Sequence, residues 1–255
     1  MKEVVKTLPQ HSYIYLGDNA RTPYGSRDQK EIYKFTTEGI VELFSRGANL
    51  VILACNTSSS SALRKIQQEF LPRYFPKKKV LGIIIPTAEE IKKFTANNKI
   101  GILATEATVA SRAYVDEIKK VDASIKVYQQ ACPLFVPMIE AGAISGEKME
   151  AAIEKYLNNI FEQEPKIDAV ILGCTHYALI EKNVRALLPK NIKLVSQGKI
   201  IAEKLKDYLR RHEEIDHALG KKGKRVFLTT KKSKKIKHLA ELFYGKELEL
   251  EVIEL

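Results

Sequence analysis

Short apolar runs alternate along this chain with longer amphipathic stretches, and this alternation limits the possible folds more than any other feature. Runs such as Leu50–Ala54 and Ala169–Leu172 are continuously apolar, which is typical of strands buried on both faces. Stretches such as Gln29–Phe44 and Glu147–Phe161 place apolar residues at helical spacing. Strands that alternate with helices predict mainly parallel sheets covered by helices on both faces. The expected fold class is therefore α/β.

The same patterns predict the remaining elements of the chain. The sequence Thr87-Ala88-Glu89-Glu90 has the form of a capping box and predicts the start of a helix. Further strands are expected at Ile14–Leu16, Val80–Ile85, Ile100–Ala104, Ile192–Val195, Val226–Thr229 and Leu248–Ile253, and further helices at Leu179–Leu188, Ile200–Leu209 and Ile236–Phe243.

The composition indicates a soluble, basic protein of one or two domains. Of the 255 residues, 42 are Lys or Arg and 31 are Asp or Glu, so the net charge of +11 attracts anions. Three cysteines are too few for a disulfide scaffold and are typical of a reducing compartment. Because the N-terminus lacks a signal-peptide core and no apolar run approaches about 20 residues, we expect a cytoplasmic protein that does not span a membrane.

A basic segment near the C-terminus raises the question of nucleic-acid binding. Residues Lys221–Arg225 are nearly all basic, and more lysines follow as far as Lys237. The segment lacks interleaved aromatic residues and any known binding motif. We interpret residues 221–237 as a solvated loop and helix face, and consider nucleic acid an unlikely partner. The histidines outside the motifs described below, His11, His212, His217 and His238, are expected at the surface.

One motif occurs twice in the chain. Val51–Thr57 resembles Val170–His176: each is an apolar strand that ends in a cysteine, followed by small polar residues and a predicted helix. In open α/β sheets, ligands bind at the carboxyl ends of the strands. The repeat therefore predicts two similar halves, with Cys55 and Cys174 on opposite sides of a cleft.

The position of these cysteines has chemical consequences. A thiol at the start of a helix is favoured as the thiolate by the free backbone amides, which also bind carboxylates. Two thiols facing each other suit the inversion of a carbon stereocentre, because one removes a proton and the other delivers a proton to the opposite face. The third cysteine, Cys132, is expected to pack as a small hydrophobe. No zinc site is expected, because the chain has no pair of cysteines at metal-ligand spacing.

At these residues the sequence resembles the glutamate racemases of the aspartate/glutamate racemase superfamily. The resemblance is specific because its motifs occur in order over most of the chain. They are Tyr15–Asp18 with Pro23–Gly25, Ala54–Thr57, Cys132–Pro137 with Glu140, Gly173–Tyr177 and, at the tail, Phe227–Thr230.

The resemblance implies interconversion of L- and D-glutamate without pyridoxal phosphate, metal or nucleotide, supplying D-glutamate for peptidoglycan. It implies that Cys55 takes the proton from D-glutamate and Cys174 takes it from L-glutamate. Glu140 and His176 would assist proton transfer. The family often forms homodimers. The positions implied to bind substrate are Tyr24, Gly25, Asn56, Thr57, Thr175 and His176, with Thr108 as a further contact.

The chain departs from the family pattern at two places. The family begins with a strand and a loop carrying an Asp-Ser pair, and no such stretch precedes Tyr13. This departure predicts an unpaired strand edge and impaired activity for residues 1–255 alone. The second departure is at Val195–Gly198, where the family usually has an Asp directly after the apolar residue.

Together these observations predict two pseudo-symmetric α/β domains with the active site in the cleft between them. Residues 1–85 plus 192–255 form the first domain and residues 86–191 the second. Two alternatives to a glutamate racemase remain open. One is another racemase of the superfamily, such as an aspartate racemase, although the combined motifs favour glutamate. The other is a catalytically impaired protein that acts only in binding.

Overall fold

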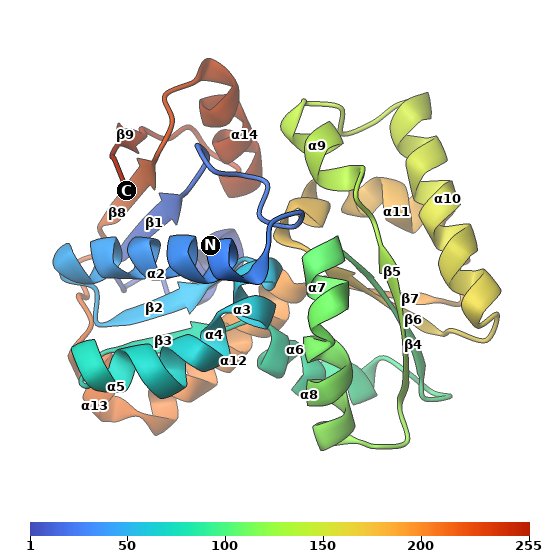
Figure 1. Cartoon of the computed structure of the whole chain (residues 1–255), viewed down its shortest axis with the longest axis horizontal. Helices are drawn as coiled ribbons and strands as arrows, with labels where there is room; N and C mark the ends of the chain where they lie inside the picture. The colour runs from blue at the N-terminus through green and yellow to red at the C-terminus, as the bar shows by residue number, and fades with distance from the viewer.

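All strand pairings in the computed structural model, which describes residues 1–255, are parallel. Parallel strands need crossover connections, and the helices that form these connections cover the faces of the sheets (Figure 1). The strands are β1 Tyr13–Gly17, β2 Leu50–Leu53, β3 Lys79–Gly82, β4 Lys99–Ala104, β5 Lys126–Ala131, β6 Ala169–Gly173, β7 Lys193–Val195, β8 Arg225–Thr229 and β9 Glu251–Val252.

The helices fall between these strands, as the alternation predicts. In chain order they are α1 Lys2–Thr7, α2 Gln29–Ser45, α3 Asn56–Ser61, α4 Leu63–Lys65, the π-helical turn Ile66–Phe70, α5 Leu71–Tyr74, α6 Ile84–Glu90, the 3₁₀ turn Ile91–Lys93, α7 Glu106–Ser111, α8 Ala113–Val121, α9 Phe135–Glu140, α10 Glu147–Gln163, the 3₁₀ turn Thr175–Leu179, α11 Glu181–Leu187, α12 Gln197–Arg211, α13 Glu213–His217 and α14 Lys234–Tyr244.

The strands divide between two units that lie side by side (Figure 1). The second unit has one sheet in the order β5-β4-β6-β7, whereas the first unit has two, β1-β8-β9 and β2-β3. In the first unit β1 pairs only with β8, and β2 only with β3. The α/β class with mainly parallel sheets is confirmed.

Buried clusters cover both faces of the second sheet and anchor the cysteine-bearing strand. Side chains of β6 alternate between the two: Val170 and Leu172 pack with α10, while Ala169 and Ile171 pack with α6 and α8. The strand is buried along its whole length. Burial on both faces explains why its sequence is continuously apolar.

Several predicted element boundaries were wrong. The run Val80–Ile85 is a strand only to Gly82, and α6 begins at Ile84. Thr87 is not a cap, because it lies inside α6 and its hydroxyl donates to the Ile83 carbonyl at 2.7 Å. A short apolar run does not distinguish a buried strand from a buried helix, so the pattern could not place this change. The strand expected at Leu248–Ile253 is also shorter, because only Glu251–Val252 pairs with β8.

Two long-range contacts also differ from what the sequence predicts: the pairing of β7 with β6 and the burial of His11. The expected domain boundary at residue 191 falls just before β7, and β7 pairs with β6, so the second sheet extends to Val195. His11, expected at the surface, is 3% exposed, with its Nε2 atom 2.7 Å from Asp216 Oδ1. His11 is buried because α13, which carries Asp216, docks beside the N-terminal segment.

Candidate active site

The two matched cysteines lie at the carboxyl ends of parallel strands, one in each unit. Cys55 follows β2 and precedes the first residue of α3, and it is partly exposed. Cys174 follows β6 and precedes the 3₁₀ turn Thr175–Leu179, and it is 8% exposed. Each thiol is thus followed directly by the start of a helical segment, where backbone amides lack helical partners and favour negative charge.

Cys174 is the end of a chain of titratable groups. The Sγ atom of Cys174 lies 3.9 Å from Nδ1 of His176, and Nε2 of His176 lies 3.1 Å from Oε1 of Glu140. The other oxygen of Glu140 accepts a hydrogen bond of 3.3 Å from the hydroxyl of Thr22, a residue of the first unit. The structure therefore brings together three of the predicted catalytic residues, and Thr22 is a contact that the sequence did not indicate.

The surroundings of His176 favour its protonated form. Burial opposes a charge on the ring, but the hydrogen bonds to Cys174 and Glu140 outweigh it and raise the pKa of His176 to about 10. The ring also forms an edge-to-face pair with Phe243 in α14, with an angle of 89° between the ring planes and centroids 5.7 Å apart. An imidazolium beside the thiol stabilises a thiolate at Cys174.

Tyr24 and Gly25, predicted to bind substrate, lie between β1 and α2, and Gly25 contacts the second unit. The hydroxyl of Tyr24 donates to the carboxylate of Asp18, and burial together with Asp18 raises the pKa of Tyr24. A Cβ atom on Gly25 would lie 2.6 Å from Cβ of Thr105 in the second unit. The backbone carbonyl of Gly25 accepts a hydrogen bond of 3.0 Å from the amide of Ala107. Only glycine permits this close approach.

Three threonine hydroxyls meet where α3 faces α7. Thr57 Oγ1 lies 3.0 Å from Thr105 Oγ1 and 3.5 Å from Thr108 Oγ1. Thr57 and Thr108 were predicted from the sequence, whereas Thr105 was missed, although its place just before α7 is a helix-capping signal. All three are buried. Thr175, the other predicted threonine, is exposed beside Cys174.

The side chain of Asn56 does not face open space. It is 1% exposed, its amide group donates to Gln197 and its carbonyl oxygen accepts from Tyr114. The part of Asn56 that remains for an anionic ligand is its backbone amide, at the start of α3. Gln197 and Tyr114 are partners that the sequence did not reveal.

A family model described as Asp/Glu/Hydantoin racemase matches residues 1–205 of the chain. The chain belongs to this family. The prediction of an amino-acid racemase, an isomerase, is confirmed at the level of the family.

Relatives in the family cover almost the whole chain. A glutamate racemase from Caulobacter sp. strain K31 is 38% identical over 98% of this chain and 94% of its own length. A crystal structure of glutamate racemase from Francisella tularensis in complex with D-glutamate, 32% identical, covers 99% of this chain and 91% of its own with a TM-score of 0.85. The Bacillus anthracis isoform RacE1 has a TM-score of 0.87 at 28% identity, covering 99% of this chain and 91% of its own.

Cys132 has a packing role in this racemase. It is 1% exposed within the core of the second unit, and burial raises the pKa of its thiol. Its thiol donates a hydrogen bond to the Gln130 carbonyl, with 3.5 Å between sulfur and oxygen. The predicted packing role is confirmed.

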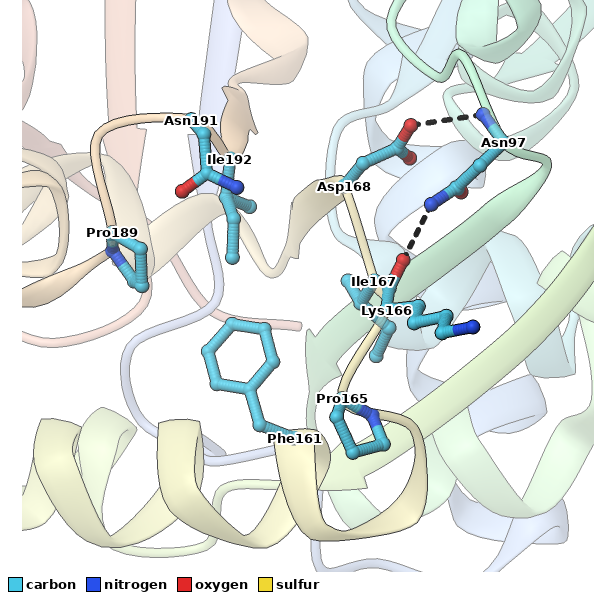
Figure 2. Close-up of a pocket in the computed structure, with 9 residues that line it drawn as sticks. All are labelled: Asn97, Phe161, Pro165, Lys166, Ile167, Asp168, Pro189, Asn191 and Ile192. Carbon is cyan, nitrogen blue, oxygen red and sulfur yellow. Dashed lines mark hydrogen bonds between the residues drawn. The ribbon is translucent and has the colours of Figure 1, made fainter.

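A cavity of about 390 Å³ lies at the opposite edge of the second sheet from Cys174. Figure 2 shows its wall at the amino ends of β4 and β6, where Asp168 accepts a hydrogen bond from the Asn97 backbone amide. Asn97 in turn donates from its side chain to the Lys166 carbonyl. These polar groups bond to one another across the loops. The cavity is remote from the thiols, and we assign it no role in the reaction.

No helix of the chain combines the length and the hydropathy needed to cross a membrane.

Proposed function

We propose that this protein is a glutamate racemase that interconverts L- and D-glutamate by a two-base mechanism without a cofactor. The observation that carries the proposal is the chain Cys174–His176–Glu140 at the end of β6, matched by Cys55 at the end of β2. The substrate is inferred from the relatives, which are glutamate racemases, one of them bound to D-glutamate.

In each turnover one cysteine takes a proton from the α-carbon and the other cysteine supplies one. With D-glutamate bound, the Cys55 thiolate takes the α-proton and becomes a thiol. The Cys174 thiol then delivers its own proton to the opposite face of the α-carbon, which yields L-glutamate and leaves Cys174 as the thiolate. In the reverse direction the two thiols exchange roles.

The neighbouring groups have distinct parts in this mechanism. Protonated His176 stabilises the Cys174 thiolate, and Glu140 holds the ring in place and balances its charge. The backbone amides after each cysteine bind substrate carboxylates. Tyr24, Gly25, Asn56, Thr57, Thr108 and Thr175 form or support the walls of the substrate site. We further propose that the protein acts in the cytoplasm as a homodimer and supplies D-glutamate for peptidoglycan.

The test is the origin of the α-proton. In deuterated water, L-glutamate converted by the protein should give D-glutamate labelled at the α-carbon, while the remaining L-glutamate stays unlabelled early on. Deuterium accumulates over hours, so mass spectrometry after chiral separation detects even slow turnover. Early label in both enantiomers would point to a single base, and conversion of aspartate in preference to glutamate would reassign the substrate.

A further inference from the structure

Four buried side chains from four helices form one hydrogen-bonded cluster next to Cys55. They are Asn56 of α3, Thr87 of α6, Tyr114 of α8 and Gln197 of α12. Thr87 and Tyr114 are fully buried, Asn56 is 1% exposed and Gln197 is 8% exposed. Burying polar groups of this kind costs free energy unless every donor and acceptor has a hydrogen-bond partner.

Three of these side chains close a ring in which each donates to the next. The Gln197 side-chain amide donates to the Tyr114 hydroxyl at 2.7 Å, the hydroxyl donates to Asn56 Oδ1 at 2.7 Å, and Asn56 Nδ2 donates to Gln197 Oε1 at 2.8 Å. The second hydrogen of the Gln197 amide reaches the Thr87 hydroxyl at 2.9 Å. Burial raises the pKa of Tyr114, which keeps its hydroxyl a donor.

The hydrogen bonds around the ring require a side chain at position 197 that accepts from Asn56 and donates to Tyr114 and Thr87, and glutamine does both. A rotated amide at Gln197 would point its NH₂ group at the NH₂ group of Asn56. A carboxylate has the same shape but only accepts hydrogen bonds, so it would lose the donation to Tyr114 and to Thr87. A methionine fills a similar volume and makes none of the three hydrogen bonds.

The ring lies where the chain passes between the two units. Thr87 is on the helix that leads from β3 of the first unit to β4 of the second. Gln197 begins α12, which follows β7 of the second unit and packs against α1 of the first. Tyr114 belongs to the core of the second unit, and Asn56 is bonded directly to Cys55. Gln197 makes a hydrogen bond to each of the other three.

We propose that Gln197 is a positioning residue of the racemase: through the side chain of Asn56 it fixes the strand end that carries Cys55 against the second unit, which carries Cys174. This inference rests on the proposed function.

The experiment compares the reactivity of the two thiols. Iodoacetamide alkylation of Cys55 and Cys174 is followed separately by peptide mass spectrometry in the full chain, in Gln197→Met and in Gln197→Glu. We expect the rate at Cys55 to change several-fold in both variants while the rate at Cys174 stays the same. The kcat for glutamate should fall by as much as about 10²-fold, with a smaller change in KM, because small misplacements of a reacting group are costly. Gln68→Met, at an exposed glutamine, is the matched control.

Each result supports or overturns the positioning role of Gln197. An unchanged Cys55 rate in folded Gln197→Met overturns it, and so does an equal change at both thiols, which would report general loosening. If Gln197→Met does not fold, Tyr114→Phe opens the same ring from the second unit and carries the same expected result. If neither variant folds, the ring serves folding alone and the positioning role is rejected. If the unmodified protein does not racemise glutamate, the proposed function fails, while the alkylation comparison still tests the placement of Cys55.

Discussion

Glu140 Oε1 lies 3.1 Å from His176 Nε2, although the two residues belong to different helical segments. The opposite nitrogen of the same ring faces Cys174 at 3.9 Å. The imidazole is therefore held between a carboxylate and a thiol, and when protonated it interacts favourably with negative charge on both. This arrangement makes the Cys174 side of the site dependent on pH, and it distinguishes Cys174 from Cys55, which has no histidine among its hydrogen-bond partners.

Substitution should show that racemisation needs Cys55 and Cys174 and does not need Cys132. Cys55→Ser and Cys174→Ser should each lower racemisation by about 10²–10⁴-fold, because each removes one of the two acid–base groups. Both proteins should keep the circular dichroism spectrum of the parent. Cys132→Ser should retain turnover and lose some stability, since a hydroxyl replaces a buried sulfur in the core. Near-normal turnover in either of the first two variants would contradict the two-base mechanism.

His176 should titrate far above the ordinary pKa of a histidine, which is near 6.5. Carbon-detected NMR of the five histidine rings should show His176 with a pKa of about 10, because its hydrogen bonds to Cys174 and Glu140 outweigh burial. Glu140→Gln should shift this titration to lower pH. A ring that titrates near 6.5 in the unmodified protein would contradict this prediction.

The same shift predicts how stability depends on pH. The folded state binds the His176 proton more tightly than the unfolded state, whose pKa is near 6.5. The stabilisation is therefore complete below pH 6.5 and is lost as pH rises through about 10. Urea unfolding at pH 6, 8 and 10 should show this decline, and His176→Asn should flatten it. An equal decline in both proteins would assign the effect to other groups.

Gly25→Ala should loosen the contact between the two units. The added Cβ would lie 2.6 Å from Cβ of Thr105, so the backbone must shift, at a cost of about 1–3 kcal/mol. Gly39→Ala is the matched control, because its Cβ would only touch a Leu16 methyl group at 3.4 Å inside α2. That change should stabilise by up to about 1 kcal/mol. Thermal unfolding measures both, and equal effects would refute the close approach.

Phe243 should influence the reaction through His176. Its ring packs perpendicular to the imidazole, and aromatic pairs of this kind contribute about 0.5–1.5 kcal/mol. Phe243→Ala should therefore lower kcat by about two- to tenfold, and Phe243→Leu by less. Val121→Ala, at an exposed apolar residue of α8, serves as the control. Equal activity of Phe243→Ala and the parent would show that α14 is not needed to place His176.

Local sequence patterns were sufficient for the α/β class and for the two reactive strand ends. The apolar runs before Cys55 and Cys174 predict buried parallel strands, and chain direction alone then places both thiols at the carboxyl ends. The same patterns could not locate the start of α6, because Val80–Ile85 is apolar throughout and both strand and helix bury such a run.

Only the tertiary structure decided which distant side chains meet. Asn56 and Gln197 are 141 residues apart in the chain, and His11 and Asp216 are 205 apart. No local periodicity reports such pairs, because a hydrogen bond across the core depends on how whole helices dock. The sequence determined the chemistry available at the two strand ends. Packing determined that His176 sits between Cys174 and Glu140, and that the Asn56 side chain is held by Gln197 and Tyr114 and not left free for substrate.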